Sequence, residues 1–271
     1  MKKRWMVLLS ALLLILTACA SAQELRVDFY DMGKADSMLI TTPKGYRILI
    51  DAGTNKGGKA LVSRFKKEDV GSLDMMLITH YDKDHVGGAD QILEDIDVRQ
   101  VVMPVYSKES KQYTQFAEAL EESGAEAIRL KIGSDMTVTT DDGVTMLVTA
   151  AHRPNYGKDE ENDFSLAVRL SYGDTKFFFA GDAEDPRQRE LLEEGDVACD
   201  VLKVPYHGRL VNASEEFLTE ASPSIAFITD SEEEPASAKV IGMLEALGAD
   251  VYCAKDGGIA VVSDGKGVRV L

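Results

Sequence analysis

The chain has 271 residues, of which 45% are hydrophobic and 28% are charged, and it contains 22 glycines and 7 prolines. This composition is typical of a globular protein, and the length allows one large α/β domain or two small ones. The formal net charge is −16 at pH 7, and no stretch gathers lysine or arginine into a basic stripe. Stable binding to duplex nucleic acid is therefore not expected.

The amino-terminal residues 1–18 are predicted to be an export signal. Three basic residues precede an apolar run over residues 5–16, which is too short for a membrane-spanning helix. The tetrad Leu-Thr-Ala-Cys that follows resembles the lipobox of bacterial lipoproteins, so we expect Cys19 to be the first mature residue and the lipid anchor. A plain secretory signal and an uncleaved amino-terminal anchor are the alternatives. All three place the rest of the chain outside the cytoplasm.

Short alternating apolar segments open the remaining chain and predict strands at residues 25–30, 38–41 and 47–50. Asp36 lies in the turn-rich segment between the first two strands, and Asp51 directly follows the third. Each of these carboxylates either orients a metal ligand through a hydrogen bond or caps a turn. Gly57 and Gly58 then open a basic helix that is predicted to reach Phe65.

The segment 73–88 contains the densest group of polar side chains with metal-binding chemistry. The apolar run 73–78 predicts a buried strand, and Gly87-Gly88 predicts a turn into a helix. The loop between them carries His80, Asp82, Asp84 and His85. Imidazole and carboxylate side chains at such density suit a divalent metal ion that keeps an open position for water. A solvated polar turn is the simpler alternative.

The rest of the chain alternates strands and helices. Further strands are predicted at residues 98–103, 127–130, 145–150, 164–170, 176–180 and 201–204. Helices are predicted after Gly88, over residues 110–122 and from Asp185, and residues 153–162 are predicted to be a loop. Two halves of this kind would stack sheet on sheet with helices outside. Because no linker separates them, we predict one domain over residues 24–271.

Two further strand ends carry candidate ligands, namely Asp182 and His207. Together with the 80–85 motif they resemble the metallo-β-lactamase fold superfamily, and more narrowly the ComEC-type branch of competence proteins. The residues that carry the resemblance are Asp31-Met32-Gly33-Lys34-Ala35-Asp36-Ser37 (the branch has Asp-Val-Gly-Gln-Gly-Asp-Ser), Ile50-Asp51-Ala52-Gly53, the His-x-Asp-x-Asp-His motif from His80 to His85, Asn162-Asp163-Phe164-Ser165-Leu166, Ala180-Gly181-Asp182 and Leu202-Lys203-Val204-Pro205-Tyr206-His207-Gly208.

The resemblance implies an α/β protein with an αββα four-layer sandwich and two divalent metal ions, zinc or manganese with magnesium as a further choice. His80 and Asp82 would hold one ion; Asp84, His85 and His207 would hold the other, with Asp182 as a bridge and Asp84 in a catalytic role. Tyr206 and Arg209 depart from the pattern, which has histidine and serine there. The usual histidine from the middle of the fold has no clear counterpart. His152 is either a metal ligand or a residue that supports one, with an exposed loop histidine as the favoured alternative. Lys203 is either a phosphate contact or a structural lysine.

These features predict a metal-dependent hydrolase that acts on ester bonds, with a phosphodiester favoured because the nearest relatives act on phosphodiesters. Hydrolysis of a carboxyl ester or lactone is one alternative. A non-catalytic accessory lipoprotein on the same fold, for instance in DNA uptake, is the other. The partners expected are an ester substrate and, through the lipid anchor alone, the membrane. Cys199 and Cys253 are predicted to be buried free thiols.

Overall fold

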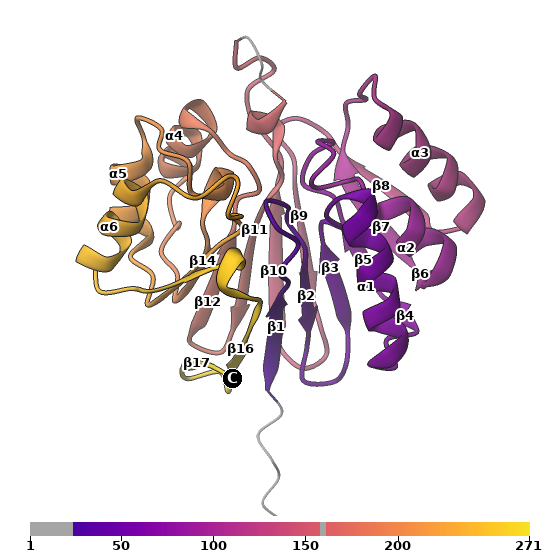
Figure 1. The fold of residues 1–271 in the computed structure, drawn as a ribbon, viewed down its shortest axis with the longest axis horizontal. Coiled ribbons are helices and arrows are strands. Elements are labelled where there is room, and N and C mark those ends of the chain that lie inside the picture. Colours follow the sequence, from indigo (N-terminus) through magenta and orange to yellow (C-terminus); the bar gives the residue numbers. More distant parts are fainter. Residues whose placement is uncertain (1–23, 158–160) are drawn as a thin grey trace, which may run out of the picture.

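The structure, a computed structural model, describes residues 24–157 and 161–271. Two β-sheets lie face to face, and helices cover the outer face of each sheet (Figure 1). The predicted signal and Cys19 lie outside the described residues. In the described ranges, no helix is long and apolar enough to cross a membrane.

The first sheet has eight strands in the order β17-β16-β1-β2-β3-β5-β7-β8. Their bounds are β1 (Leu25–Phe29), β2 (Met38–Thr41), β3 (Arg47–Ile50), β5 (Met75–Leu77), β7 (Gln100–Pro104), β8 (Glu126–Leu130), β16 (Ile259–Ser263) and β17 (Val268–Val270). The strands from β3 to β8 are parallel. Parallel neighbours need crossover connections, which here contain α1 (Asn55–Lys67), α2 (Ala89–Asp95) and α3 (Lys111–Ser123).

The second sheet has seven strands in the order β15-β14-β13-β12-β11-β10-β9. Their bounds are β9 (Asp135–Thr139), β10 (Val144–Thr149), β11 (Ala167–Tyr172), β12 (Thr175–Phe179), β13 (Val201–Lys203), β14 (Ile225–Ile228) and β15 (Asp250–Cys253). The parallel half from β12 to β15 alternates with α4 (Asp185–Glu194), α5 (Ser214–Ala221) and α6 (Ala238–Ala246). The described part of the chain also contains three short 3-10 helices: η1 (Asn162–Phe164), η2 (Pro205–Gly208) and η3 (Ala254–Asp256).

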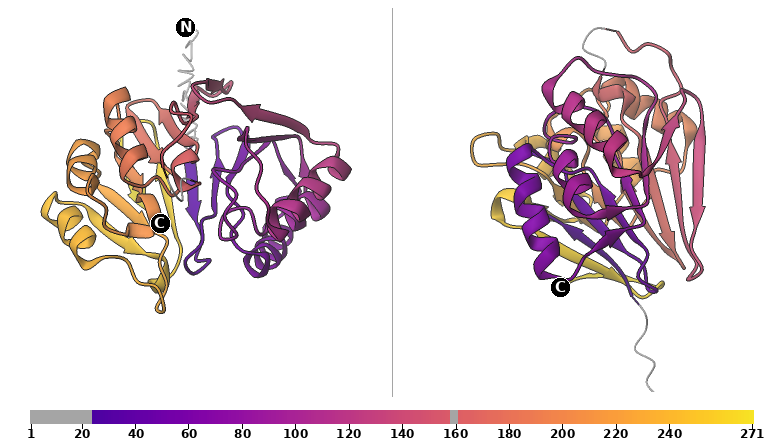
Figure 2. Two further views of the ribbon diagram at one scale, coloured as in Figure 1. Left: turned by 90° about the horizontal axis from the view of Figure 1, so that it is seen from above. Right: turned by 90° about the vertical axis from the view of Figure 1, so that its right-hand side faces the viewer.

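The main hydrophobic core lies between the two sheets. Phe29 of β1 packs against Phe179 of β12 and Phe227 of β14, with ring centroids 6.0 and 5.0 Å apart. Two further apolar clusters fill the spaces under α1–α3 and under α4–α6. Seen from above, these helix groups lie on opposite outer faces (Figure 2). The predicted αββα four-layer sandwich is therefore confirmed.

Several predicted elements differ in detail. The run 73–78 is not one strand, because Asp74 accepts a hydrogen bond from the Arg47 amide (2.9 Å) and separates β5 from the short strand β4 (Ser72–Leu73). The run 98–103 is divided in the same way, and its first part, β6 (Asp97–Val98), pairs with β4. The predicted strand at 164–170 begins only at Ala167, after η1. Strand β9 has no counterpart among the predicted elements.

Both cysteines among the described residues are free, as predicted. Cys199 is buried, whereas Cys253 is only partly buried.

A close contact between glycines fixes the loop that carries the 80–85 motif. Gly58 of α1 lies against Gly88, so a Cβ added at Gly58 would come within 2.5 Å of the Gly88 Cα. A Cβ added at Gly88 would lie 2.3 Å from the carbonyl oxygen of Ala52. Helix α1 and the end of the motif loop can therefore approach this closely only because both positions lack a side chain.

We expect Gly58→Ala to lower the free energy of unfolding by about 1–3 kcal/mol, because backbone must move to admit the methyl group. Gly242→Ala in α6 is the matched control, since no atom lies within 4 Å of the added Cβ. There the gain in helix propensity should stabilise the protein by up to roughly 1 kcal/mol. Chemical denaturation measures both changes, and equal stabilisation by the two variants would contradict the close-contact interpretation.

Candidate metal centre

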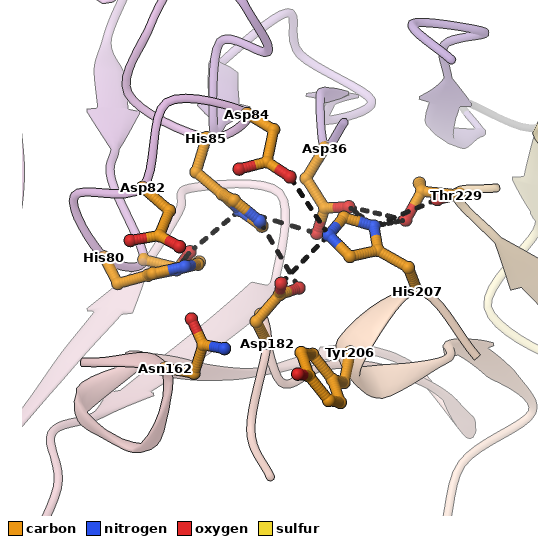
Figure 3. A network of polar contacts seen from close by, with 12 residues as sticks. Asp36, His80, Asp82, Asp84, His85, Asn162, Asp182, Tyr206, His207 and Thr229 are labelled. Carbon is orange, nitrogen blue, oxygen red and sulfur yellow. Dashed lines mark hydrogen bonds and ion pairs between the residues drawn. The ribbon is translucent and has the colours of Figure 1, made fainter. Parts of the chain in front are cut away.

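The residues predicted to bind metal come from loops at one edge of the sandwich. The 80–85 motif follows β5 of the first sheet, Asp182 follows β12 of the second sheet, and His207 lies in η2 after β13. These side chains point toward one another in Figure 3. The edge is where the carboxyl ends of parallel strands from both sheets meet, which is the usual place for a site in α/β proteins.

Asp182 lies between two of the histidines. Its Oδ1 is 3.3 Å from His85 Nε2, and its Oδ2 is 2.9 Å from His207 Nε2. Asp84 Oδ2 lies 3.6 Å from the same His207 nitrogen. The His80 ring stands beside the His85 ring, with centroids 4.1 Å apart. The structure therefore brings His80, Asp84, His85, Asp182 and His207 into one cluster, called the Asp/His cluster below.

Hydrogen bonds on the outer nitrogen orient the histidines. His207 Nδ1 donates to the Thr229 carbonyl oxygen (2.9 Å), and His85 Nδ1 donates to Asp51 Oδ2 (2.8 Å). Each Nε2 atom is buried; those of His85 and His207 face Asp182, and that of His80 has no hydrogen-bond partner among the described residues. Buried imidazole nitrogens without partners are rare unless they face an ion or water. Their arrangement around Asp182 therefore fits a divalent cation.

Asp51 accepts the hydrogen bonds that orient two of the histidine rings. Its Oδ1 accepts from the Thr79 amide (2.8 Å), and its Oδ2 accepts from the Thr79 hydroxyl (2.7 Å) as well as from His85. Because the Thr79 hydroxyl proton points to Asp51, its oxygen is free to accept from His80 Nδ1, 3.1 Å away. One fully buried carboxylate thus sets the ring orientation of two histidines.

Asp36 and Lys203 lie beneath the cluster. Asp36 forms an ion pair with Lys203, and both side chains are fully buried. Asp36 Oδ1 also accepts from the Thr229 hydroxyl (2.6 Å), while Lys203 donates to the Gly181 carbonyl oxygen (3.0 Å). One ligand atom each from Asp36, His85, Asp182 and His207 lie within 4.8 Å of one another. Because Asp36 faces the Lys203 ammonium, we assign it to support of the histidines rather than to metal binding.

Asp82 and His152 lie differently from the cluster. Asp82 is partly exposed, and its Oδ1 pairs with Lys108 Nζ at 2.5 Å. His152 contacts Glu194 (3.3 Å) and Asp135 (4.0 Å), and no contact in the described part of the chain joins it to the cluster. Asp82 therefore remains a candidate ligand, because it lies beside His80 in Figure 3. His152 does not, because it contacts no member of the cluster.

The cluster is strongly charged. Burial and the neighbouring His85 lower the pKa of His80 to about 4, so this ring is neutral. Although burial opposes it, His207 and His85 hold the pKa of Asp182 well below its usual value. Burial also opposes ionisation of Asp84, but His85 and Lys34 lower its pKa to about 2. Ionised carboxylates beside a neutral imidazole form a donor set suited to zinc or manganese.

Backbone strain accompanies the position of His207. Tyr206 and His207 have φ values of 51° and 52°, a left-handed conformation that costs about 1–3 kcal/mol for residues other than glycine. The next residue, Gly208, continues this turn with φ 70°. The turn directs the imidazole back toward Asp182 while Tyr206 faces the cavity above the cluster.

That cavity has a volume of about 770 Å³. Its lining is mostly polar and comprises Met32, Gly33, Lys34, Thr54, Asp82, Lys83, Asp84, Lys108, Ser110, Gln112, Asn162, Asp182, Tyr206, Arg209, Ser231, Glu233 and Glu234. The cluster therefore lies at the base of an open, polar cavity large enough for a substrate of several tens of atoms.

Sequence reasoning missed the hydroxyl groups around the histidines. Thr79 precedes His80 directly, Ser165 Oγ lies 3.3 Å from His80 Nδ1, and Thr229 follows β14. Ser165 stood within the Asn-x-x-Ser-Leu motif, and Thr229 stood at a strand end on the same edge. These two positions could have indicated from the sequence that Ser165 and Thr229 lie near the candidate ligands.

We expect Asp51→Asn to weaken metal binding about 10- to 100-fold. The new amide would donate toward His85 Nδ1, which would then have to accept, so the proton would move to Nε2 and block the ligand position. Competition with a chromophoric chelator measures the affinity. Asp28→Asn is the control, since Asp28 of β1 pairs with Arg26 instead. Unchanged metal affinity in Asp51→Asn would contradict the conclusion that Asp51 orients the histidine rings for metal binding.

The sequence matches the family described as the metallo-beta-lactamase superfamily over residues 30–228. It is 28% identical over 235 residues to ComE operon protein 3 of Bacillus subtilis, which covers 80% of this chain and 30% of that protein. It is 24% identical over 215 residues to Recombination protein 2 of Haemophilus influenzae, covering 78% of this chain and 25% of that protein. This chain thus spans less than a third of either relative.

Solved structures share the fold. A metal-dependent hydrolase of the beta-lactamase superfamily superposes with a TM-score of 0.56 at 12% identity, covering 86% of this chain and 97% of that chain. A long-form RNase Z from yeast superposes with a TM-score of 0.54 at 14% identity, covering 93% and 43%. The ComEC-type resemblance expected from the motifs is confirmed by the two relatives, and the chain belongs to the metallo-beta-lactamase superfamily.

Proposed function

We propose that this protein is an extracytoplasmic, metal-dependent phosphodiesterase. The observation that carries the proposal is the cluster at the base of a polar cavity, in which the buried Nε2 atoms of His85 and His207 face Asp182 and the His80 ring lies beside that of His85. Two divalent cations, zinc or manganese with magnesium as a further choice, would supply a nucleophile from water at neutral pH and neutralise charge on the leaving oxygen.

The residues divide into two groups around Asp182. We assign His85, His207 and Asp84 to one cation, because all three contact one another or Asp182. We assign His80 and Asp82 to the other, with Asp182 between the two. Asp84 lines the cavity and would also accept a hydrogen bond from the attacking water, which orients that water toward the ester.

The surroundings favour a phosphodiester over a carboxyl ester. Lys34, Lys83, Lys108 and Arg209 line the cavity, although the chain as a whole is acidic. Cationic side chains that line such a cavity attract the phosphate groups of a substrate and hold them by charge-assisted hydrogen bonds. The RNase Z named above shares the fold, and its name indicates action on RNA, whose backbone is made of phosphodiesters. The net charge of −16 favours a small or single-stranded substrate over a duplex.

We expect Asp182→Asn to lower the rate of hydrolysis of a phosphodiester chromogen by more than tenfold, because an amide replaces a charged oxygen shared by both ligand groups. His85→Ala should be at least as severe and should also lower the metal content. The assay uses residues 20–271 with zinc or manganese, and Arg269→Gln on β17 serves as the control. Full metal content without turnover of any ester would favour the non-catalytic accessory lipoprotein. Turnover of carboxyl esters or lactones alone would favour the carboxyl-ester or lactone hydrolase.

We also propose that Cys19 anchors the mature protein to the outer side of a membrane. The lipobox-like tetrad at residues 16–19 supports this, and the two ComEC-type relatives are consistent with a role outside the cytoplasm. One acyl chain gives only reversible membrane binding, so a lipoprotein carries more than one.

We expect Cys19→Ser to move the protein from the membrane fraction of expressing cells to the soluble extracytoplasmic fraction or to leave its signal uncut. Immunoblotting of fractions and the mass of the mature chain measure this. Cys199→Ser is the control, since that thiol is buried in the folded domain. A wild-type chain that is found mainly in the cytoplasm would contradict the proposal.

A further inference from the structure

Four cationic side chains line the cavity, together with Glu233, Glu234 and the carboxylates of Asp82, Asp84 and Asp182. Two of the four cations stand where this chain departs from the ComEC-type pattern: Lys34 replaces a glutamine, and Arg209 replaces a serine. The two residues are far apart in the sequence but line the same cavity.

Lys34 and Arg209 converge on one oxygen atom. Arg209 Nη2 lies 2.8 Å from Glu234 Oε2, and Lys34 Nζ lies 3.9 Å from the same atom. A single carboxylate oxygen therefore occupies the position between two cations. Lys108 differs, because it is held by Asp82 and Glu161 on the other side of the cavity.

The contact with Glu234 is of a kind that another anion can displace. The side chains of Arg209 and Glu234 are 48% and 53% exposed, so solvent and salt screen their attraction. Arg209 also lies over the Tyr206 ring, 5.3 Å from its centroid, which holds the guanidinium at the cavity when Glu234 moves away.

The pair of cations also lies next to the Asp/His cluster. Lys34 Nζ is 3.1 Å from Asp84 Oδ2, and Arg209 follows His207 by two residues in the chain. An anionic group held by the two cations would thus lie beside the reacting bond rather than in place of it.

We propose that Lys34 and Arg209 form a subsite for a second phosphate group of the substrate, and that Glu234 occupies this subsite as an internal counter-anion in the free protein. The proposal rests on the phosphodiesterase function proposed above. A guanidinium binds two phosphate oxygens at once, and an ammonium adds a point charge, so this pair suits phosphate. The substrate class is therefore one with a phosphate adjacent to the scissile phosphodiester, as in an oligonucleotide.

The test compares thymidine dinucleotides with and without a 5′-phosphate, using the mature chain with its metal. The wild type should have a KM about tenfold lower for the phosphorylated dinucleotide. Arg209→Gln should abolish this difference by raising that KM about tenfold, with kcat within twofold, because one charge-assisted contact is lost. Glu234→Gln should lower the same KM, since the competing carboxylate charge is removed.

Equilibrium binding of inorganic phosphate, measured by calorimetry, gives a second readout that does not depend on turnover. Affinity should rise several-fold in Glu234→Gln and fall about tenfold in Arg209→Gln. Glu24→Gln and Arg269→Gln are matched controls, because these residues form an exposed ion pair of the same type at β17. They change the net charge equally and should leave both readouts unchanged.

The outcomes separate the two proposals. If neither dinucleotide is cleaved but phosphate binding responds to Arg209 and Glu234, the subsite stands and the phosphodiesterase proposal is wrong. If both dinucleotides are cleaved with a KM ratio that Arg209→Gln and Glu234→Gln leave unchanged, the subsite is wrong and the phosphodiesterase proposal stands. Equal responses in the control pair would reduce the effect to net charge and would also overturn the subsite.

Discussion

The hydrogen bonds that Asp51 accepts are the interaction on which the centre depends. His85 donates to Asp51 directly and His80 is held through the Thr79 hydroxyl, so the inner nitrogen of each ring faces the Asp/His cluster. Asp51 itself has a left-handed backbone with φ 56° at the end of β3. A strained residue that ends one strand thus determines the donor atoms presented by the loop after its parallel neighbour β5.

The second sheet contributes through a different device. His207 obtains its orientation from the Thr229 carbonyl oxygen and its position from a left-handed turn. The buried Asp36–Lys203 pair joins the two sheets next to the Asp/His cluster, because Asp36 precedes β2 and Lys203 ends β13. A buried ion pair contributes little net stability, but separating its partners is costly. The pair therefore favours one relative position of the two halves.

Much of this arrangement could be predicted from the sequence, because ligands at the ends of apolar strands follow from strand order alone. The positions of the 80–85 motif, Asp182 and His207 belong to this class. His152 could not be placed in the same way, since its contacts with Glu194 and Asp135 arise from packing of a loop against α4. Strand β9 escaped prediction because it is an edge strand with alternating half-buried residues and little apolar content. The hydrogen bonds from Asp51 through the Thr79 hydroxyl to His80 could not be predicted either, because sequence patterns do not give the directions of side chains.

The division of the centre between the two halves has a consequence for how the protein matures. His80 and His85 belong to the first half of the chain, whereas Asp182 and His207 are synthesised much later. The four side chains come together only when the second sheet has docked on the first, so the proposed metal binding would follow assembly of the sandwich. With the export and metal binding proposed above, the compartment in which folding is completed would select the ion, and not the one in which translation begins.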